Sequence, residues 1–238
     1  MIESDCFRVK LILFDVDGTL VDSQNLIVAA QREAFVANGL EPPSRERALS
    51  IVGLSLQEAF TVLVGPDGPV EGLAEGYRQA FGRLRADPAY HEPLFPGASD
   101  LLAELGVRAD VRLGIATGKS QRGVSHLLGR HGWGSLFATI QTADDAPSKP
   151  HPAMVKQAMA AVGAAPEETV MIGDSTFDMS MARSAGVPAV GVSWGYHPVA
   201  ALRQAGAGTI VDSYAALRVH LLEEFLGSAD LGGPTRDL

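Results

Sequence analysis

The sequence predicts an α/β fold in which a doubly wound, Rossmann-like parallel sheet forms the core and an all-helical domain is inserted into it. Three features indicate this: an apolar strand near the N-terminus that ends in aspartates, a helix-only stretch over residues 21–93, and an alternation of strands and helices from residue 94 onward. Parallel strands that alternate with helices form a sheet covered on both faces. We therefore expect residues 1–20 and 94–238 to fold together as the core, with a loose polar tail over residues 227–238.

The first strand is predicted over residues 9–14, which are rich in Val, Ile, Leu and Phe, as in a strand buried on both faces. Asp15 and Asp17 follow it, and residues two apart in an extended segment point to the same side. Both carboxylates should project from the carboxyl end of the strand, where ligands bind in open α/β sheets. Burying two carboxylates there is costly unless a cation or a proton accompanies them.

This stretch by itself allows three interpretations. An Asp-Gly turn at Asp17-Gly18 could simply take the chain out of the core. A calcium loop requires an acid or amide at its fifth position and glycine at its sixth, but Thr19 and Leu20 occupy those places. The third interpretation is phosphoryl transfer by an aspartate nucleophile beside an acid/base aspartate.

The inserted stretch has apolar residues at helical spacing, with glycine and proline between the segments. Its predicted helices are Leu26–Asn38, Arg45–Ser50, Ser55–Val64 and Val70–Arg85.

After residue 93 the two periodicities alternate. The predicted strands are Val111–Ala116, Phe137–Gln141, Thr169–Ile172, Ala189–Ser193 and Thr209–Val211. The predicted helices are Ala98–Leu105, Gln121–His131, Pro152–Val162, Thr176–Ala185, Val199–Gln204 and Tyr214–Leu226.

Two polar segments in this half suit a phosphate. Thr117-Gly118-Lys119-Ser120 follows a strand, and a hydroxyl with bare backbone N–H groups at a helix entrance can bind phosphate oxygens. A P-loop requires glycine five residues before Gly118, but Leu113 stands there. Lys149 is followed by Pro150, with another proline in the next helical turn, and this stiff segment could present an ammonium group at a fixed point.

A third strand end carries two more aspartates. Asp174 and Asp178 are four residues apart, so at a helix start they share a face. One aspartate there could simply offset the helix dipole, which explains a second one less well. With Asp15 and Asp17 they offer the hard oxygen ligands that suit Mg²⁺.

These segments resemble, in order and spacing, the four motifs of the haloacid dehalogenase-like hydrolase superfamily. They are Asp15-Val-Asp-Gly-Thr-Leu-Val, Thr117-Gly118, Lys149-Pro150 and Gly173-Asp174-Ser-Thr-Phe-Asp178. The insertion after the first motif is similar to the C1 cap of the phosphoglycolate phosphatase-like branch, as is Trp194-Gly195-Tyr196 after a late strand. The resemblance implies that residues 21–93 form a cap over the active site.

The resemblance also implies a role for each motif residue. Asp15 would form an aspartyl-phosphate, and Asp17 would act as general acid and base. Mg²⁺ would lie between the Asp15 carboxylate, the Asp17 backbone carbonyl and Asp174, while Asp178 supports the site. The phosphate-binding residues would be Thr117, Gly118 and Lys149. The expected activity is hydrolysis of a small phosphorylated metabolite, such as phosphoglycolate, a sugar phosphate, a nucleotide or pyrophosphate.

Two alternatives stay open at the level of sequence. A β-phosphoglucomutase-like phosphosugar mutase would use the same core and differ in its cap. A serine hydrolase is the alternative from another class, because Gly191-Val-Ser193-Trp-Gly195 matches the nucleophile-elbow pattern, and Asp212 and His220 follow in triad order. In a true elbow the serine enters its helix at once, whereas Tyr196-His197-Pro198 delays the helix here.

Composition limits the partners and the compartment. The net charge of −9 argues against general binding of nucleic acid or anionic membranes. Met1–Lys10 does not resemble a signal peptide, and no apolar run approaches the ~20 residues of a membrane span. The single cysteine, Cys6, fits a reducing compartment. We expect a cytoplasmic enzyme, monomeric or homodimeric, that binds a small phosphorylated metabolite and neither nucleic acid nor membrane.

Overall fold

The structure, a computed structural model, describes residues 9–227. Cys6 and the predicted tail beyond residue 227 lie outside that range. Six parallel strands form one sheet in the order β3-β2-β1-β4-β5-β6. They are β1 Lys10–Phe14, β2 Val111–Ala116, β3 Phe137–Gln141, β4 Thr169–Gly173, β5 Ala189–Val192 and β6 Thr209–Val211. The prediction of a doubly wound parallel sheet is confirmed.

The first strand lies in the middle of the sheet and pairs only with strands that follow the insertion. Phe14 is opposite Ile115 of β2 on one side and Ile172 of β4 on the other. A strand with neighbours on both sides has its backbone groups satisfied in the ladder, and helices can cover both of its faces. This explains the continuous apolar run before Asp15.

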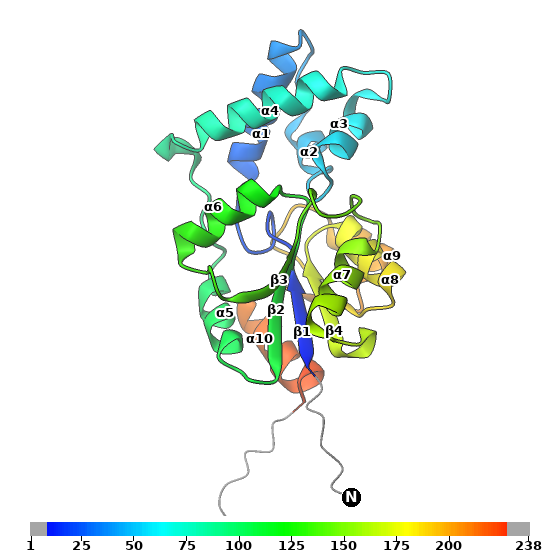
Figure 1. The fold of residues 1–238 in the computed structure, drawn as a ribbon. Coiled ribbons are helices and arrows are strands. Elements are labelled where there is room, and N and C mark those ends of the chain that lie inside the picture. Colours follow the sequence, from blue (N-terminus) through cyan, green and yellow to red (C-terminus); the bar gives the residue numbers. More distant parts are fainter. Residues whose placement is uncertain (1–8, 228–238) are drawn as a thin grey trace, which may run out of the picture.

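Helices cover the two faces of the sheet separately (Figure 1). Ile12 and Phe14 pack with α5 (Ala98–Gly106), α6 (Gln121–His131) and α10 (Tyr214–Val219). Leu11 and Leu13 belong to the opposite core, which includes residues of α7 (Ala153–Val162), α8 (Thr176–Ala185) and α9 (Val199–Ala205). Alternate residues of β1 therefore enter different cores, as the period of a strand requires.

The helices between β1 and α5 pack on one another above the sheet (Figure 1). They are α1 Gln24–Ala37, α2 Arg45–Leu49, α3 Leu56–Val64 and α4 Val70–Leu84. Phe35, Phe60 and Leu73 form an apolar cluster of their own there. The two segments that join this unit to the sheet are hydrogen-bonded to each other, since the Asp22 amide donates to the Pro93 carbonyl at 2.8 Å. We refer to residues 21–93 as the cap.

Apart from shifts of one or two residues at the helix ends, three helical details differ from the prediction. The last predicted helix, Tyr214–Leu226, divides into α10 and a π-helical segment η3 over His220–Phe225. Leu217 and Leu221 remain buried through both parts, so apolar spacing alone could not separate them. Two 3₁₀ turns, η1 Pro88–Tyr90 and η2 Pro166–Glu168, are too short to show a periodicity. None of the helices within residues 9–227 combines the length and apolar character needed to cross a membrane.

Candidate active site

The predicted site residues converge at the carboxyl edge of the sheet. Asp15, Thr117 and Asp174 each follow one of three adjacent strands, β1, β2 and β4. Parallel strands end at the same edge, so side chains distant in sequence become neighbours there. Lys149 reaches the same point from the loop before α7, with its Nζ 2.9 Å from Asp15 Oδ1.

The Lys149 ammonium group is completely buried between two carboxylates. Its Nζ lies 2.9 Å from Asp15 Oδ1 and 2.5 Å from Asp178 Oδ1. Burial by itself would lower the pKa of Lys149, but the charges of Asp15 and Asp178 outweigh it and raise that pKa. The lysine is therefore a fixed positive charge at the site, as the predicted phosphate ligand should be.

Asp15 has the environment of a reactive group. It is buried, its Oδ1 is ion-paired with Lys149, and its Oδ2 has no hydrogen-bond partner among the described residues. Burial raises the pKa of Asp15 to about 7, although Lys149 acts in the opposite direction. Buried polar atoms are rarely left unsatisfied, and unpaired ones mark functional sites.

Three carboxylates lie close enough to share a cation. Asp15, Asp174 and Asp178 each place an oxygen within 4.8 Å of the others. Oxygen-only donors suit Mg²⁺, so the residues present fit the metal that the sequence predicted. The Asp17 carboxylate is not in this cluster, and its expected contribution is its backbone carbonyl. Asp178 already binds Lys149 and the Ser175 amide and hydroxyl, which fits a supporting role.

Asp174 is contacted by the loop that follows β1 and by the segment that follows β5. Its Oδ1 accepts from the Thr19 hydroxyl at 3.1 Å, and its Oδ2 accepts from the Tyr196 amide at 2.7 Å. A Cβ atom at Gly18 would lie 2.2 Å from Asp174 Oδ2, and one at Gly195 would lie 2.1 Å from its Cβ. Burial raises the pKa of Asp174 well above its usual value, and nearby Asp15 and Asp178 raise it further. The two glycines were not assigned this role from sequence.

Asp17 is paired with Lys119, a residue to which no role was assigned from the sequence. Lys119 Nζ lies 2.7 and 3.0 Å from the two Asp17 oxygens, and the Ser23 hydroxyl donates to Asp17 at 2.6 Å. Burial raises the pKa of Asp17, but Lys119 and Ser23 outweigh it and hold that pKa below its usual value. In the sequence, a role for Lys119 could have been suspected because it directly follows Thr117-Gly118 and the chain has only four lysines.

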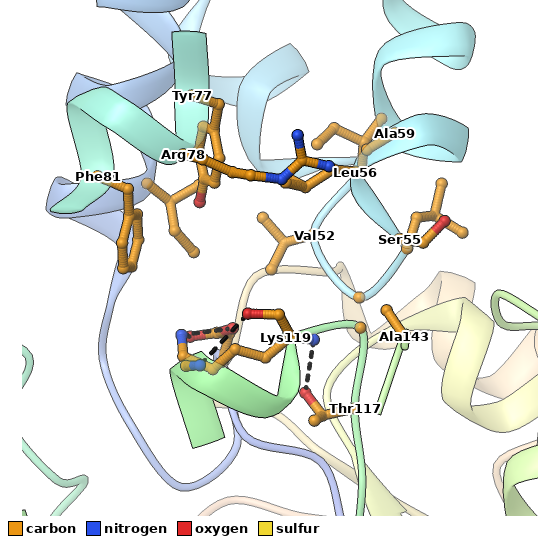
Figure 2. A pocket seen from close by; sticks show the side chains of 18 of the residues that line it. Val52, Ser55, Leu56, Ala59, Tyr77, Arg78, Phe81, Thr117, Lys119 and Ala143 are labelled. Carbon is orange, nitrogen blue, oxygen red and sulfur yellow. Dashed lines mark hydrogen bonds and ion pairs between the residues drawn. The ribbon is translucent and has the colours of Figure 1, made fainter. Parts of the chain in front are cut away.

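A cavity of about 680 Å³ opens above these residues, between the core and the cap (Figure 2). Asp15, Asp17 and Thr117 form its floor. The cap loop Val52–Ser55 lies on the core beside it, and the Ser55 amide donates to Ser148 Oγ at 2.9 Å.

Gly118 lies where this loop contacts the core. A Cβ atom at Gly118 would be 2.4 Å from the Gly53 carbonyl oxygen and 2.6 Å from that of Leu54. Because both contacts are with backbone atoms, a Gly118→Ala protein must displace the loop. We expect kcat/KM to fall by about 10²-fold, as for other ångström-scale displacements at active sites. Gly129→Ala on α6 is the matched control, since a Cβ atom there has no neighbour within 4 Å. Equal kcat/KM for the two variants would contradict this role of Gly118.

The serine-hydrolase alternative finds no support in this geometry. Ser193 directly follows β5, but the next helix, α9, begins only at Val199. Within residues 9–227, no hydrogen bond joins any two of Ser193, Asp212 and His220; Asp212 accepts from Ser213, and His220 lies 3.0 Å from Glu224.

Known proteins resemble this chain both in sequence and in structure. The chain matches the haloacid dehalogenase-like hydrolase family over residues 12–192. The "Probable phosphatase IndB" of Dickeya dadantii is 35% identical over 208 residues, which are 86% of this chain and 90% of the relative. A phosphoglycolate phosphatase of Rhodospirillum rubrum is 31% identical over 234 residues, 94% of this chain and 93% of the relative. The crystal structure of a hydrolase from Pseudomonas syringae has a TM-score of 0.78 and 30% identity, and covers 89% of this chain and 97% of its own.

Proposed function

Since the chain belongs to the phosphoglycolate phosphatase-like branch of the haloacid dehalogenase-like hydrolase family, we propose that it is a Mg²⁺-dependent phosphatase that acts through an aspartyl-phosphate at Asp15. Phosphatase activity itself follows from the family and the named relatives. The observation that carries the proposed mechanism is the Asp15 carboxylate, which lies buried beneath the cavity with Lys149 Nζ 2.9 Å from its Oδ1 and with no hydrogen bond to its Oδ2 from any described residue. The proposed substrate is a small phosphorylated metabolite.

In the first step an oxygen of Asp15 attacks phosphorus, and the bond from phosphorus to the ester oxygen breaks. Asp17, protonated at this point of the cycle, delivers its proton to the departing alkoxide and is left as a carboxylate. The Thr117 hydroxyl, the Gly118 amide and the Lys149 ammonium group hold the phosphoryl oxygens, where positioning and charge stabilisation supply most of the catalysis. The location of Lys149, 2.9 Å from the nucleophile, supports this role.

In the second step water attacks the aspartyl-phosphate, phosphate leaves and Asp15 is regenerated. Asp17 accepts the proton of this water. Its contacts with Lys119 and Ser23 favour the ionised carboxylate, which is the form that can accept a proton. The cap over the cavity limits access of bulk water to both steps.

The residues that would hold Mg²⁺ are Asp15 and Asp174 by their carboxylates and Asp17 by its backbone carbonyl, with Asp178 in support. When bound, the ion offsets the carboxylate charge and stabilises negative charge on the transferring group. Burial raises the pKa values of Asp15 and Asp174, and a cation beside them would favour their ionised forms.

Removal of the metal tests this proposal. Hydrolysis of an aryl phosphate should fall at least about 10²-fold after dialysis against a chelator, because two carboxylates would then repel an anionic substrate. Added Mg²⁺ should restore the rate and raise the midpoint of thermal unfolding, since an ion that binds only the folded chain stabilises it. Ca²⁺ should restore the rate poorly, because it prefers a larger and less regular coordination shell. Full activity in the presence of the chelator would contradict the proposed metal dependence.

A further inference from the structure

The Asp17 carboxylate receives hydrogen bonds from two donors at the edge of the cavity. Lys119 Nζ lies 2.7 Å from its Oδ1 and 3.0 Å from its Oδ2, and the Ser23 hydroxyl donates to Oδ1 at 2.6 Å. Charge-assisted donors that contact both oxygens fix the direction in which a carboxylate points. The orientation of Asp17 therefore depends on the position of the Lys119 ammonium group.

The stem of Lys119 is restrained by the helix that follows it. A lysine can hold a neighbour in place only if it is itself restrained, because its four-carbon stem is flexible. Lys119 lies against Gly123 of α6, where a Cβ atom would be 2.8 Å from Lys119 Cγ and 3.2 Å from its Cδ. Glycine at position 123 thus leaves the room that the stem occupies on its way to Asp17.

The cap restrains the charged end of the same lysine. Glu92, beside the junction of cap and core, places its Oε1 3.6 Å from Lys119 Nζ and its Oε2 3.0 Å from Arg85 Nε. The ring centroid of Phe81 on α4 lies 5.2 Å from Lys119 Nζ, a distance at which an aromatic face attracts a cation. Figure 2 shows Phe81 on the cap side of the cavity and Lys119 on the core side. The Lys119 and Glu92 side chains are only 9% and 6% exposed, so salt screens their contact little.

We propose that Lys119 is a positioning residue for the second step of the reaction. Held by the cap through Glu92 and Phe81, it directs the Asp17 carboxylate toward the water that attacks the aspartyl-phosphate. In that step the water oxygen bonds to phosphorus, the bond from phosphorus to the Asp15 oxygen breaks, and Asp17 takes the proton of the water. This inference rests on the proposed phosphatase function, and it makes the second step depend on the placement of the cap.

A slower second step has a kinetic signature that weaker substrate binding does not share. With 4-nitrophenyl phosphate the first step needs little help from an acid, because nitrophenolate is a stable leaving group. Slowing the hydrolysis of the aspartyl-phosphate lowers kcat and KM by the same factor. It leaves kcat/KM unchanged, since that ratio reports only the steps up to formation of the aspartyl-phosphate. Loss of a contact with the substrate would instead lower kcat/KM.

Lys119→Met, which keeps most of the stem, removes the ammonium group. We expect kcat for 4-nitrophenyl phosphate to fall about 10- to 100-fold, part of the effect of a general base, with KM falling in parallel and kcat/KM within about threefold of the wild type. Rapid mixing should show a burst of nitrophenolate close to the enzyme concentration, and mass spectrometry of the quenched reaction should show phosphorylated protein. Lys156→Met replaces an exposed lysine and is the matched control.

Gly123→Ala displaces Lys119 without changing any charge. Its methyl group would overlap the lysine stem, while the helix itself is not weakened, because alanine is a better helix former than glycine. The same parallel fall in kcat and KM is expected, by about threefold or more. Gly129→Ala on the same helix is the control, since a Cβ atom there has no neighbour within 4 Å. This variant decides the question if the Lys119→Met protein does not fold.

Glu92→Gln tests the link to the cap. The variant keeps the shape of the side chain but removes the negative charge beside Lys119, so kcat and KM should again fall together, by about two- to fivefold. Unchanged kinetics in Glu92→Gln would overturn the role of the cap.

The outcomes separate this inference from the phosphatase mechanism. A lower kcat/KM without accumulation of phosphorylated protein, in both Lys119→Met and Gly123→Ala, would place Lys119 on the substrate and overturn the inference alone. Full activity in Asp15→Asn, or no phosphorylated form of any of these proteins, would overturn the mechanism and the inference with it.

Discussion

Asp15→Asn should lower kcat for phosphate esters by about 10⁴-fold or more, because an amide cannot replace a carboxylate that forms the covalent intermediate. The substitution keeps the size of the side chain, and Lys149 retains Asp178 as a partner at 2.5 Å. We therefore expect the variant to fold and to bind phosphate esters. The measurement is steady-state hydrolysis of an aryl phosphate with Mg²⁺ present, together with thermal unfolding of both proteins.

Two control variants make this result specific. Asp212→Asn removes an exposed aspartate outside the site. Ser193→Ala removes the residue that would be the nucleophile if the protein were a serine hydrolase. Both should keep kcat within about twofold of the wild type, as expected for groups that do not contact the substrate. Loss of activity in Ser193→Ala together with full activity in Asp15→Asn would reverse our assignment of the nucleophile.

Lys149→Met should affect stability and activity together. Lys149 is buried between Asp15 and Asp178, so its removal leaves two carboxylates without their cation in the core of the site. Loss of one partner of a buried ion pair typically costs about 3–5 kcal/mol of unfolding free energy. We expect a decrease of that size in urea titrations under metal-free conditions, and a fall in kcat of about 10³-fold, since the phosphoryl group also loses a ligand.

Lys156→Met on α7 is the matched control for this experiment. Lys156 is exposed, so its replacement should change the unfolding free energy by no more than about 0.5 kcal/mol. A Lys149→Met protein as stable as the control would show that Asp15 and Asp178 do not depend on the ammonium group. Normal activity in that variant would remove Lys149 from the phosphate-binding set.

Much of the core could be predicted because its signals are local in the chain. An apolar run such as the one before Asp15 identifies a buried strand, and the residue after a strand is already known to lie at the sheet edge. The strand Val111–Ala116 and the helix Gln121–His131 have the predicted bounds. Where the prediction differed, as in η3, the spacing of apolar residues is the same for both conformations.

In the candidate site, the contacts between residues distant in sequence could not be predicted from local patterns. The motif aspartates and Lys149 were identified because each follows or precedes a recognisable element. Lys119 is adjacent to a predicted phosphate-binding segment, yet its pairing with Asp17 could not be inferred, because that contact spans 102 positions. Gly18 and Gly195 likewise meet at Asp174 only after the chain has folded.

The sequence by itself therefore determined the parallel α/β core, the helical insertion and the carboxylates and lysine that carry the proposed chemistry, since strand ends and their motifs are encoded within a few residues. Only the tertiary structure decided how the cap meets the core: the Ser55–Ser148 contact and the cavity beside it. Helical periodicity shows which face of a helix is buried but not what it is buried against. The shape of the substrate cavity depends on that packing.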